Sequence, residues 1–157
     1  WSEYKKIMAN GVHPLCGSIE EALRVPYTKK KKLAIASSNT KEAINKQLLD
    51  HKLNWYFDLV ISKEDLPVEN GLPKLKPQPH SLLRVLEHSG YFPREAIYVG
   101  DQPSDIHAAR NVAIFAKEPI KTIAVTYGFA SREKLEEAKP DYIVDDTKEL
   151  SDLLKTF

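Results

Sequence analysis

The chain has 157 residues, the size of one ordinary α/β domain and too few for two well-packed domains. Lysine and arginine total 23 against 22 aspartate and glutamate residues, so the net charge of +1 creates no strong field for nucleic acid or an anionic membrane. Apolar runs such as Leu33 to Ala36 are much shorter than a membrane span, and the single cysteine, Cys16, excludes an intrachain disulfide. We expect a cytoplasmic globular domain that binds neither nucleic acid nor membrane.

Apolar runs of strand length alternate along the chain with amphipathic runs of helix length. This pattern is typical of a parallel sheet whose strands are connected by crossover helices. The expected strands are continuously apolar and rich in β-branched residues, as strands buried on both faces are. They cover residues 33–36, 59–61, 97–99, 122–125 and 142–144. The sequence therefore predicts an α/β fold with a parallel sheet.

Helices are expected between these strands. The first covers residues 41–51, and Asn39 with Glu42 three positions later indicates its N-terminal capping pair. The second has an apolar face around Leu82 and Leu86 and ends at Gly90, and the third begins at Pro103. The last two are expected at 132–139 and 148–155.

Residues 64–76 are rich in proline and glycine, which predicts an irregular loop of the kind that binds ligands at a sheet edge.

A cluster of hydroxyl and amide side chains follows the first expected strand, in the order Ser37, Ser38, Asn39 and Thr40. A helix start offers free backbone N–H groups and the positive end of the helix dipole, and a hydroxyl adds a neutral donor. The segment therefore suits a phosphate group. Taken alone, ordinary helix capping is the simpler explanation for these residue types.

Lys76 lies beside two prolines, in the segment Lys76-Pro77-Gln78-Pro79, just before a helix. An ammonium held in one place attracts a phosphate and also stabilises negative charge that develops in a transition state. Taken alone, this lysine is weak evidence, since an exposed lysine next to proline is usually a solvated loop residue.

Two carboxylates follow the third expected strand, in the segment Gly100-Asp101-Gln102-Pro103-Ser104-Asp105. Carboxylate oxygens at a strand end suit Mg²⁺, which usually takes one or two protein carboxylates and keeps several waters. For Asp105 there is a simpler explanation, because an acid is favoured in the first turn of a helix. For Asp101 the structural explanation is weaker, because an acid that ends a buried strand has less structural reason to occur, so Asp101 is the better candidate for a metal ligand.

In this order the three segments resemble the haloacid dehalogenase superfamily, in its phosphoglycolate-phosphatase-like branch. Ser37 stands where the second motif of the family has serine or threonine, and Lys76 matches the lysine of the third motif. Gly100-Asp101-x-x-x-Asp105 matches the fourth motif, and segments 122–128 and 140–145 are similar to the last two strands of the family. The resemblance extends from about residue 12 to the end and implies a three-layer, Rossmann-like core.

The family's first motif, Asp-x-Asp-Gly, is missing, because no Asp-x-Asp occurs anywhere in the sequence. In the family this motif ends the first strand, which lies between the second-motif and fourth-motif strands, and a helical cap follows it. The resemblance thus implies that residues 1–11 are the end of the cap and that 12–157 form the core without its first strand. Leu75 and His80 stand where the third motif usually has a glycine and an acid, which leaves the substrate open.

A sheet without its central strand would expose two rows of unpaired backbone groups inside the domain, which is costly. The chain also begins with Trp1 instead of methionine. We therefore expect that the functional protein has a further N-terminal segment, either as preceding residues or as a separate piece, and that this chain is inactive alone.

The resemblance implies that the complete protein hydrolyses a small phosphorylated metabolite through an aspartyl-phosphate formed on the first motif. Ser37, with Ser38, would bind the phosphoryl group, Lys76 would stabilise its charge, and Mg²⁺ would be held by Asp101 and by Asp105. The implied catalytic residues are Ser37, Lys76 and Asp101. Two alternatives stay open: a phosphomutase that uses the same intermediate, and a non-catalytic protein that retains only the fold.

Overall fold

The computed structural model describes residues 17–157, so the segment expected to end the cap, residues 1–11, lies outside the described part. Helices and strands alternate through it, as expected from the sequence. The helices are α2 (Ile19–Thr28), α3 (Lys41–Asp50), α4 (His80–Ser89), α5 (Pro103–Asn111), α6 (Ala113–Ala116), α7 (Arg132–Glu137) and α8 (Thr147–Leu154). The strands are β1 (Ala34–Ala36), β2 (Leu59–Ile61), β3 (Val68–Glu69), β4 (Leu72–Pro73), β5 (Ile97–Gly100), β6 (Lys121–Val125) and β7 (Tyr142–Val144).

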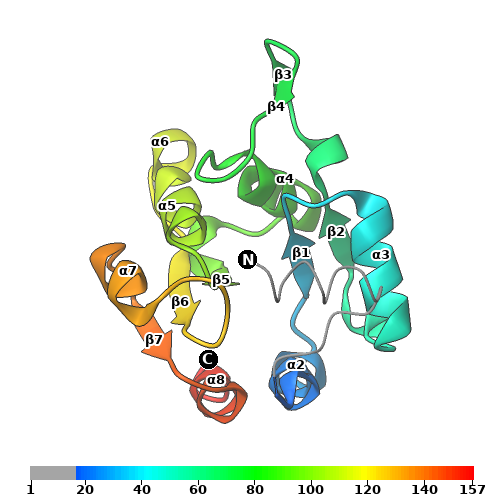
Figure 1. Cartoon of the computed structure of the whole chain (residues 1–157), viewed down its shortest axis with the longest axis vertical. Helices are drawn as coiled ribbons and strands as arrows, with labels where there is room; N and C mark the ends of the chain where they lie inside the picture. The colour runs from blue at the N-terminus through cyan, green and yellow to red at the C-terminus, as the bar shows by residue number, and fades with distance from the viewer. Residues whose placement is uncertain (1–16) are drawn as a thin grey trace.

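The strands pair in two parallel groups. β1 pairs with β2, so that Ile35 lies opposite Val60, while β6 pairs with β5 on one side and β7 on the other. Figure 1 shows β1 and β5 as inner neighbours, with β2 beyond β1 and with β6 and β7 beyond β5. Within residues 17–157 no ladder joins β1 to β5. The predicted parallel α/β fold is confirmed, and its sheet is divided at this position.

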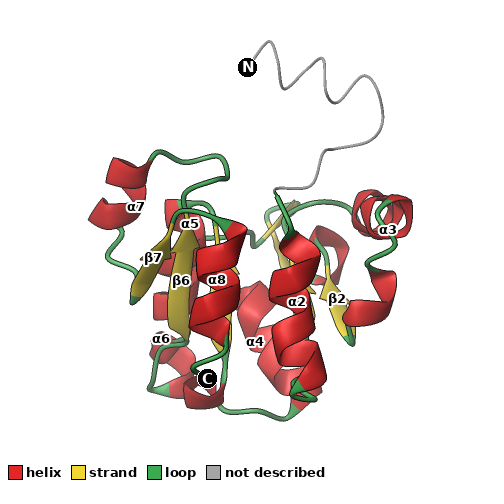
Figure 2. Ribbon diagram, turned by 90° about the horizontal axis from the view of Figure 1, so that it is seen from below, coloured by secondary structure: helices red, strands yellow, loops and turns green. Residues whose placement is uncertain are grey.

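Helices cover both faces of the strands and make three layers (Figure 2). α2 packs against α8 on one face, while α4 contacts β1 and β2 and α5 contacts β5 and β6 on the other. Each face has its own apolar core. One contains Leu82, Leu86, Ala108, Ala109, Val112 and Ile120, and the other contains Ala22, Ile123, Val125, Val144 and Leu150. Burial on both faces is why β6 is continuously apolar.

An apolar cavity of about 650 Å³ lies between the two strand groups. Residues of α2, β1, α4, β5 and α8 line it, among them Ala36, Leu86 and Val99. The sequence pattern predicts strands buried on both faces, but the two inner strands are partly exposed. Ala34 of β1 is exposed, and Val99 of β5 keeps 37% of its surface accessible. The exposure follows from the division of the sheet, because these residues face the cavity.

The structure corrects two local expectations. Asn39 is not the N-cap of α3: the cap is Thr40, whose side chain accepts a hydrogen bond from the Ala43 N–H. The stretch 64–76 is not wholly irregular, because β3 and β4 form an antiparallel hairpin around Asn70 and Gly71. Both turn residues have positive φ, the conformation that an Asn-Gly hairpin turn requires. Pro73 lies within β4 and Pro67 directly precedes β3, and both are tolerated because the two short strands are edges.

Helix α2 ends directly before the four lysines, residues 29–32, that precede β1. It contains Pro26, which normally argues against a helix interior. Pro26 lies near the end of the helix, and the buried Ala22 anchors the helix against the core. In the described part of the chain, every helix is too short or too polar to cross a bilayer.

Candidate active site

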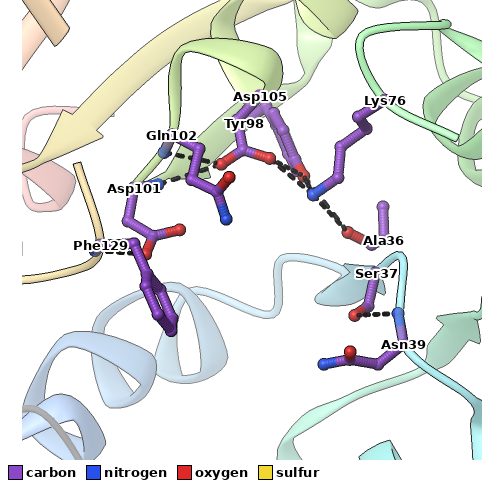
Figure 3. A network of polar contacts seen from close by, with 9 residues as sticks. All are labelled: Ala36, Ser37, Asn39, Lys76, Tyr98, Asp101, Gln102, Asp105 and Phe129. Carbon is purple, nitrogen blue, oxygen red and sulfur yellow. Dashed lines mark hydrogen bonds and ion pairs between the residues drawn. The ribbon is translucent and has the colours of Figure 1, made fainter. Parts of the chain in front are cut away.

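The side chains singled out from the sequence meet where β1 and β5 end (Figure 3). Ser37 directly follows β1, Asp101 directly follows β5, and Asp105 lies in the first turn of α5. Lys76 comes from the loop before α4, is joined to Pro77 by a cis peptide bond, and reaches between the two strand ends. Residues far apart in the sequence thus share one edge of the strands.

Asp105 is the most enclosed of these residues, with 3% of its surface exposed. Its Oδ2 accepts hydrogen bonds from the backbone N–H groups of Asp101 and Gln102, at 3.1 and 3.0 Å. Its Oδ1 lies 2.5 Å from Nζ of Lys76. The carboxylate thus caps α5 with one oxygen and pairs with the lysine through the other. Both oxygens are engaged by groups of this chain.

The ammonium of Lys76 faces three oxygens. Besides Asp105, these are the Tyr98 hydroxyl at 3.0 Å and the backbone carbonyl of Ala36 at 3.4 Å. Burial disfavours the charged form of Lys76 and lowers its pKa. The charges and hydrogen bonds of Tyr98 and Asp105 have the larger combined effect and hold the pKa of Lys76 above its ordinary value. The result is a cation fixed at the end of β1, beside Ser37.

Tyr98 of β5 completes this group. Its hydroxyl lies 3.2 Å from the Ala36 carbonyl and 3.2 Å from Oδ1 of Asp105. Burial, only partly offset by the neighbouring Lys76 charge, raises the pKa of Tyr98 to about 12. The phenol therefore stays protonated near neutral pH and acts as a hydrogen-bonding group. Sequence reasoning did not assign it a role, because in the strand pattern it counts only as one more apolar residue.

Asp101 is held by the loop between β6 and α7. Its Oδ2 accepts a hydrogen bond from the Phe129 N–H at 2.9 Å, and its backbone carbonyl accepts one from Ala130. Gly128 lies so close that an added Cβ would meet the Asp101 Cβ at 2.2 Å, so only glycine fits there. Within residues 17–157 no hydrogen bond reaches the second oxygen, Oδ1. Gly128 and Phe129 are site residues whose role was not inferred from the sequence.

The hydroxyl cluster after β1 has a less enclosed position. The Ser37 N–H donates to the Ile61 carbonyl, and the Ser37 hydroxyl accepts from the Asn39 N–H at 3.1 Å. Ser37 is partly buried, whereas Ser38 is exposed. The contact between Lys76 and the Ala36 carbonyl brings the lysine to the residue beside Ser37.

The chemistry of Asp101 suits a hard divalent cation, since its carboxylate is fixed by one oxygen and leaves the other available. Asp105 suits the role less well, because three donors of the chain already bind it and the Tyr98 hydroxyl also lies 3.2 Å from its Oδ1. No group of three or more His, Cys, Asp or Glu side chains that could hold a metal occurs among residues 17–157. Of the two carboxylates, Asp101 is therefore the one whose chemistry fits a divalent cation.

The chain is similar in sequence to a known pyrophosphatase and to a known phosphoglycolate phosphatase. Over 123 aligned residues the chain is 33% identical to the pyrophosphatase PpaX of Bacillus mycoides, which covers 78% of the chain and 50% of that protein. It is 33% identical over 99 residues to the phosphoglycolate phosphatase of Nitrosococcus oceani, covering 63% of the chain and 39% of that protein. The chain thus spans half or less of the length of these relatives.

A solved structure from Clostridium acetobutylicum, described as a predicted phosphatase, matches the fold with a TM-score of 0.73. The two are 27% identical, and the match covers 90% of this chain and 60% of the other. The family of haloacid dehalogenase-like hydrolases matches residues 1–117. With its parallel α/β fold and its lysine and carboxylates at the strand ends, the chain belongs to the haloacid dehalogenase-like hydrolases, a family of enzymes.

Proposed function

We propose that the complete protein is a Mg²⁺-dependent phosphatase that hydrolyses a small phosphorylated metabolite of the phosphoglycolate type. The observation that carries the proposal is the fixed Lys76 cation, which lies between the end of β1, next to Ser37, and the carboxylates that follow β5. A cation beside neutral donors suits a phosphoryl group, and a carboxylate with an available oxygen suits the ion that accompanies it. The pyrophosphatase and phosphoglycolate phosphatase relatives support the same class of chemistry.

Each residue has a separate role in this proposal. The Ser37 hydroxyl donates a hydrogen bond to the phosphoryl group, and Lys76 stabilises its charge as the bond to the leaving group breaks. The nucleophile is an aspartate of the first motif, outside the 157 residues, which forms an aspartyl-phosphate that water then hydrolyses. Asp101 would hold Mg²⁺, which would neutralise phosphate charge and orient the attack. Asp105 holds Lys76 and the loop after β5, and would add its negative charge to the field at that ion.

We also propose that a first-motif segment adds a strand between β1 and β5. Its support is the apolar cavity and the edge of β1 that, within residues 17–157, pairs with no strand. Leu33 and Ser37 direct their backbone groups toward β2, through bonds with Asp58 and Ile61. Because such groups alternate along a strand, Ala34 and Ala36 direct theirs away from β2. A parallel strand that enters the cavity would pair with the backbone groups of Ala34 and with the Ala36 N–H. It would bring its carboxyl end to Lys76, which binds the Ala36 carbonyl.

Hydrogen exchange tests this added strand. In the complete natural protein the amide hydrogens of Ala34 and Ala36 should exchange as slowly as that of Ile35. Two-dimensional NMR of the deuterium-exposed protein measures all three in one sample. Fast exchange of Ala34 and Ala36 beside a protected Ile35 would show that no strand occupies the cavity.

Asp101→Asn in the complete natural protein tests the phosphatase. The substitution keeps the size and the Phe129 hydrogen-bond acceptor but removes the charge, so Mg²⁺-dependent hydrolysis of p-nitrophenyl phosphate should fall at least about a hundredfold. The melting temperature should stay within about 2 °C. His107→Gln on the exposed side of α5 is the matched control and should keep full activity. Unchanged activity in Asp101→Asn would overturn the assignment.

The same assay separates the competing functions. A phosphomutase would transfer the phosphoryl group to a second hydroxyl of a sugar phosphate and release little inorganic phosphate, whereas a phosphatase releases one phosphate per turnover. A non-catalytic protein would give no Mg²⁺-dependent release from any phosphate ester. Measuring inorganic phosphate across a panel of small phosphate esters distinguishes the three outcomes.

A further inference from the structure

Among residues 17–157, the hydrogen-bond partners of the Tyr98 hydroxyl all belong to the group around Lys76. The hydroxyl lies 3.0 Å from the Lys76 ammonium, 3.2 Å from Oδ1 of Asp105 and 3.2 Å from the Ala36 carbonyl (Figure 3). A phenol in this position is costly to bury unless its oxygen is hydrogen-bonded, and phenylalanine would fill the same space without that cost. The hydroxyl therefore has a specific use at this place.

The donors of Lys76 show what that use is. An ammonium has three hydrogens, and three oxygens surround this one, of which Asp105 and Tyr98 are the nearer two. Tyr98 has a single hydrogen and accepts from Lys76, so it donates its own hydrogen to Asp105 or to Ala36. Two of the three lysine hydrogens are thus fixed, and the third points to the end of β1, beside Ser37.

We infer that Tyr98 is a positioning residue, which fixes the direction of the Lys76 hydrogen that meets the phosphoryl group. The inference rests on the proposed phosphatase function for its catalytic consequence. Asp105 alone would hold the ammonium at one point and leave it free to turn about the axis of its chain. The second contact, from Tyr98 on a different element, removes this rotation. When a phosphoryl group binds, it would take the place of the Ala36 carbonyl as the third acceptor of Lys76. The Tyr98 hydroxyl would still accept from Lys76 and would donate its own hydrogen to the Ala36 carbonyl.

The hydrogen bond between Tyr98 and Lys76 is tested by NMR, with no measurement of enzyme activity. In the complete natural protein with ¹⁵N-labelled lysine, the ¹H–¹⁵N signal of the Lys76 ammonium is assigned by its loss in Lys76→Arg. Tyr98→Phe keeps the ring and removes only the hydroxyl, and should speed hydrogen exchange of this ammonium with water by about tenfold. Tyr142→Phe on β7, whose ring contacts Phe157, is the matched control and should leave the signal unchanged.

The catalytic part is tested by steady-state kinetics with p-nitrophenyl phosphate. A misdirected donor weakens the transition state more than substrate binding, so kcat of Tyr98→Phe should fall about tenfold while KM changes less than about twofold. Tyr142→Phe should match the unsubstituted protein in both. An unaltered Lys76 signal, or an altered signal with unchanged kcat, would overturn the inference. If the unsubstituted protein has no phosphatase activity, the proposed function fails, and the NMR comparison still decides the contact between Tyr98 and Lys76.

Discussion

The Lys76 ammonium lies 2.5 Å from Oδ1 of Asp105, and 16% and 4% of the two side chains are exposed. The pair joins the loop before α4 to the first turn of α5, across 29 positions of sequence. Because Asp105 also binds the backbone of Asp101 and Gln102, one carboxylate orients both Lys76 and the loop that carries Asp101.

Asp105→Asn should lower stability strongly, because it leaves the Lys76 charge without its partner in a nearly buried place. The loss of unfolding free energy should be about 3 kcal/mol, measured by urea unfolding of the complete natural protein. Asp152→Asn removes an exposed acid that contacts Lys148 and Lys155, and should cost less than about 1 kcal/mol. Equal losses in the two variants would mean that burial of the pair has no energetic consequence.

Gly128→Ala should reduce activity, because the added Cβ would meet Asp101 at 2.2 Å and must displace it. We expect kcat for p-nitrophenyl phosphate to fall at least about tenfold, and the remaining activity to respond less to added Mg²⁺. The control is Gly90→Ala, whose added Cβ meets nothing within 4 Å but whose φ of 75° is unfavourable for alanine. It should lower unfolding free energy by about 1 kcal/mol and leave kcat unchanged.

Thr40→Ala should destabilise helix α3, because the Thr40 side chain accepts the Ala43 N–H. A loss of about 1 kcal/mol in unfolding free energy is expected from urea titration. Asn39→Ala is the matched comparison, since Asn39 is the residue that the sequence pattern favours as the cap. A larger loss from Asn39→Ala than from Thr40→Ala would contradict the observed cap.

Alkaline pH should destabilise the protein through Tyr98. The pKa of its phenol rises from 10.0 to about 12 on folding, so the folded state binds more protons between these values. Unfolding free energy should then decrease as pH rises from about 10 to 12, by at most about 1.4 kcal/mol per pH unit. Urea unfolding across this range measures the slope, and Tyr98→Phe should reduce it. Lys76 acts in the same direction, because its raised pKa gives stability that is lost as the ammonium deprotonates.

The secondary structure and the order of the site segments could be predicted from the sequence. The five long strand runs were located to within one or two residues, and Gly90 and Pro103 marked a helix end and a helix start correctly. These features depend on neighbours a few positions away: apolar periodicity, the left-handed conformation of glycine and the fixed φ of proline. The resemblance to a hydrolase family came from the same local motifs.

Tertiary structure decided the rest. It showed that Asp105 caps α5 while it binds Lys76, that Tyr98 joins them, and that β1 and β5 stay apart around a cavity. The contact between Tyr98 and the Ala36 carbonyl spans 62 positions of sequence. Which side chains meet across such distances depends on strand pairing, on helix packing and on the path of the loops. A local pattern contains none of this information, because it describes each segment before the others are packed against it.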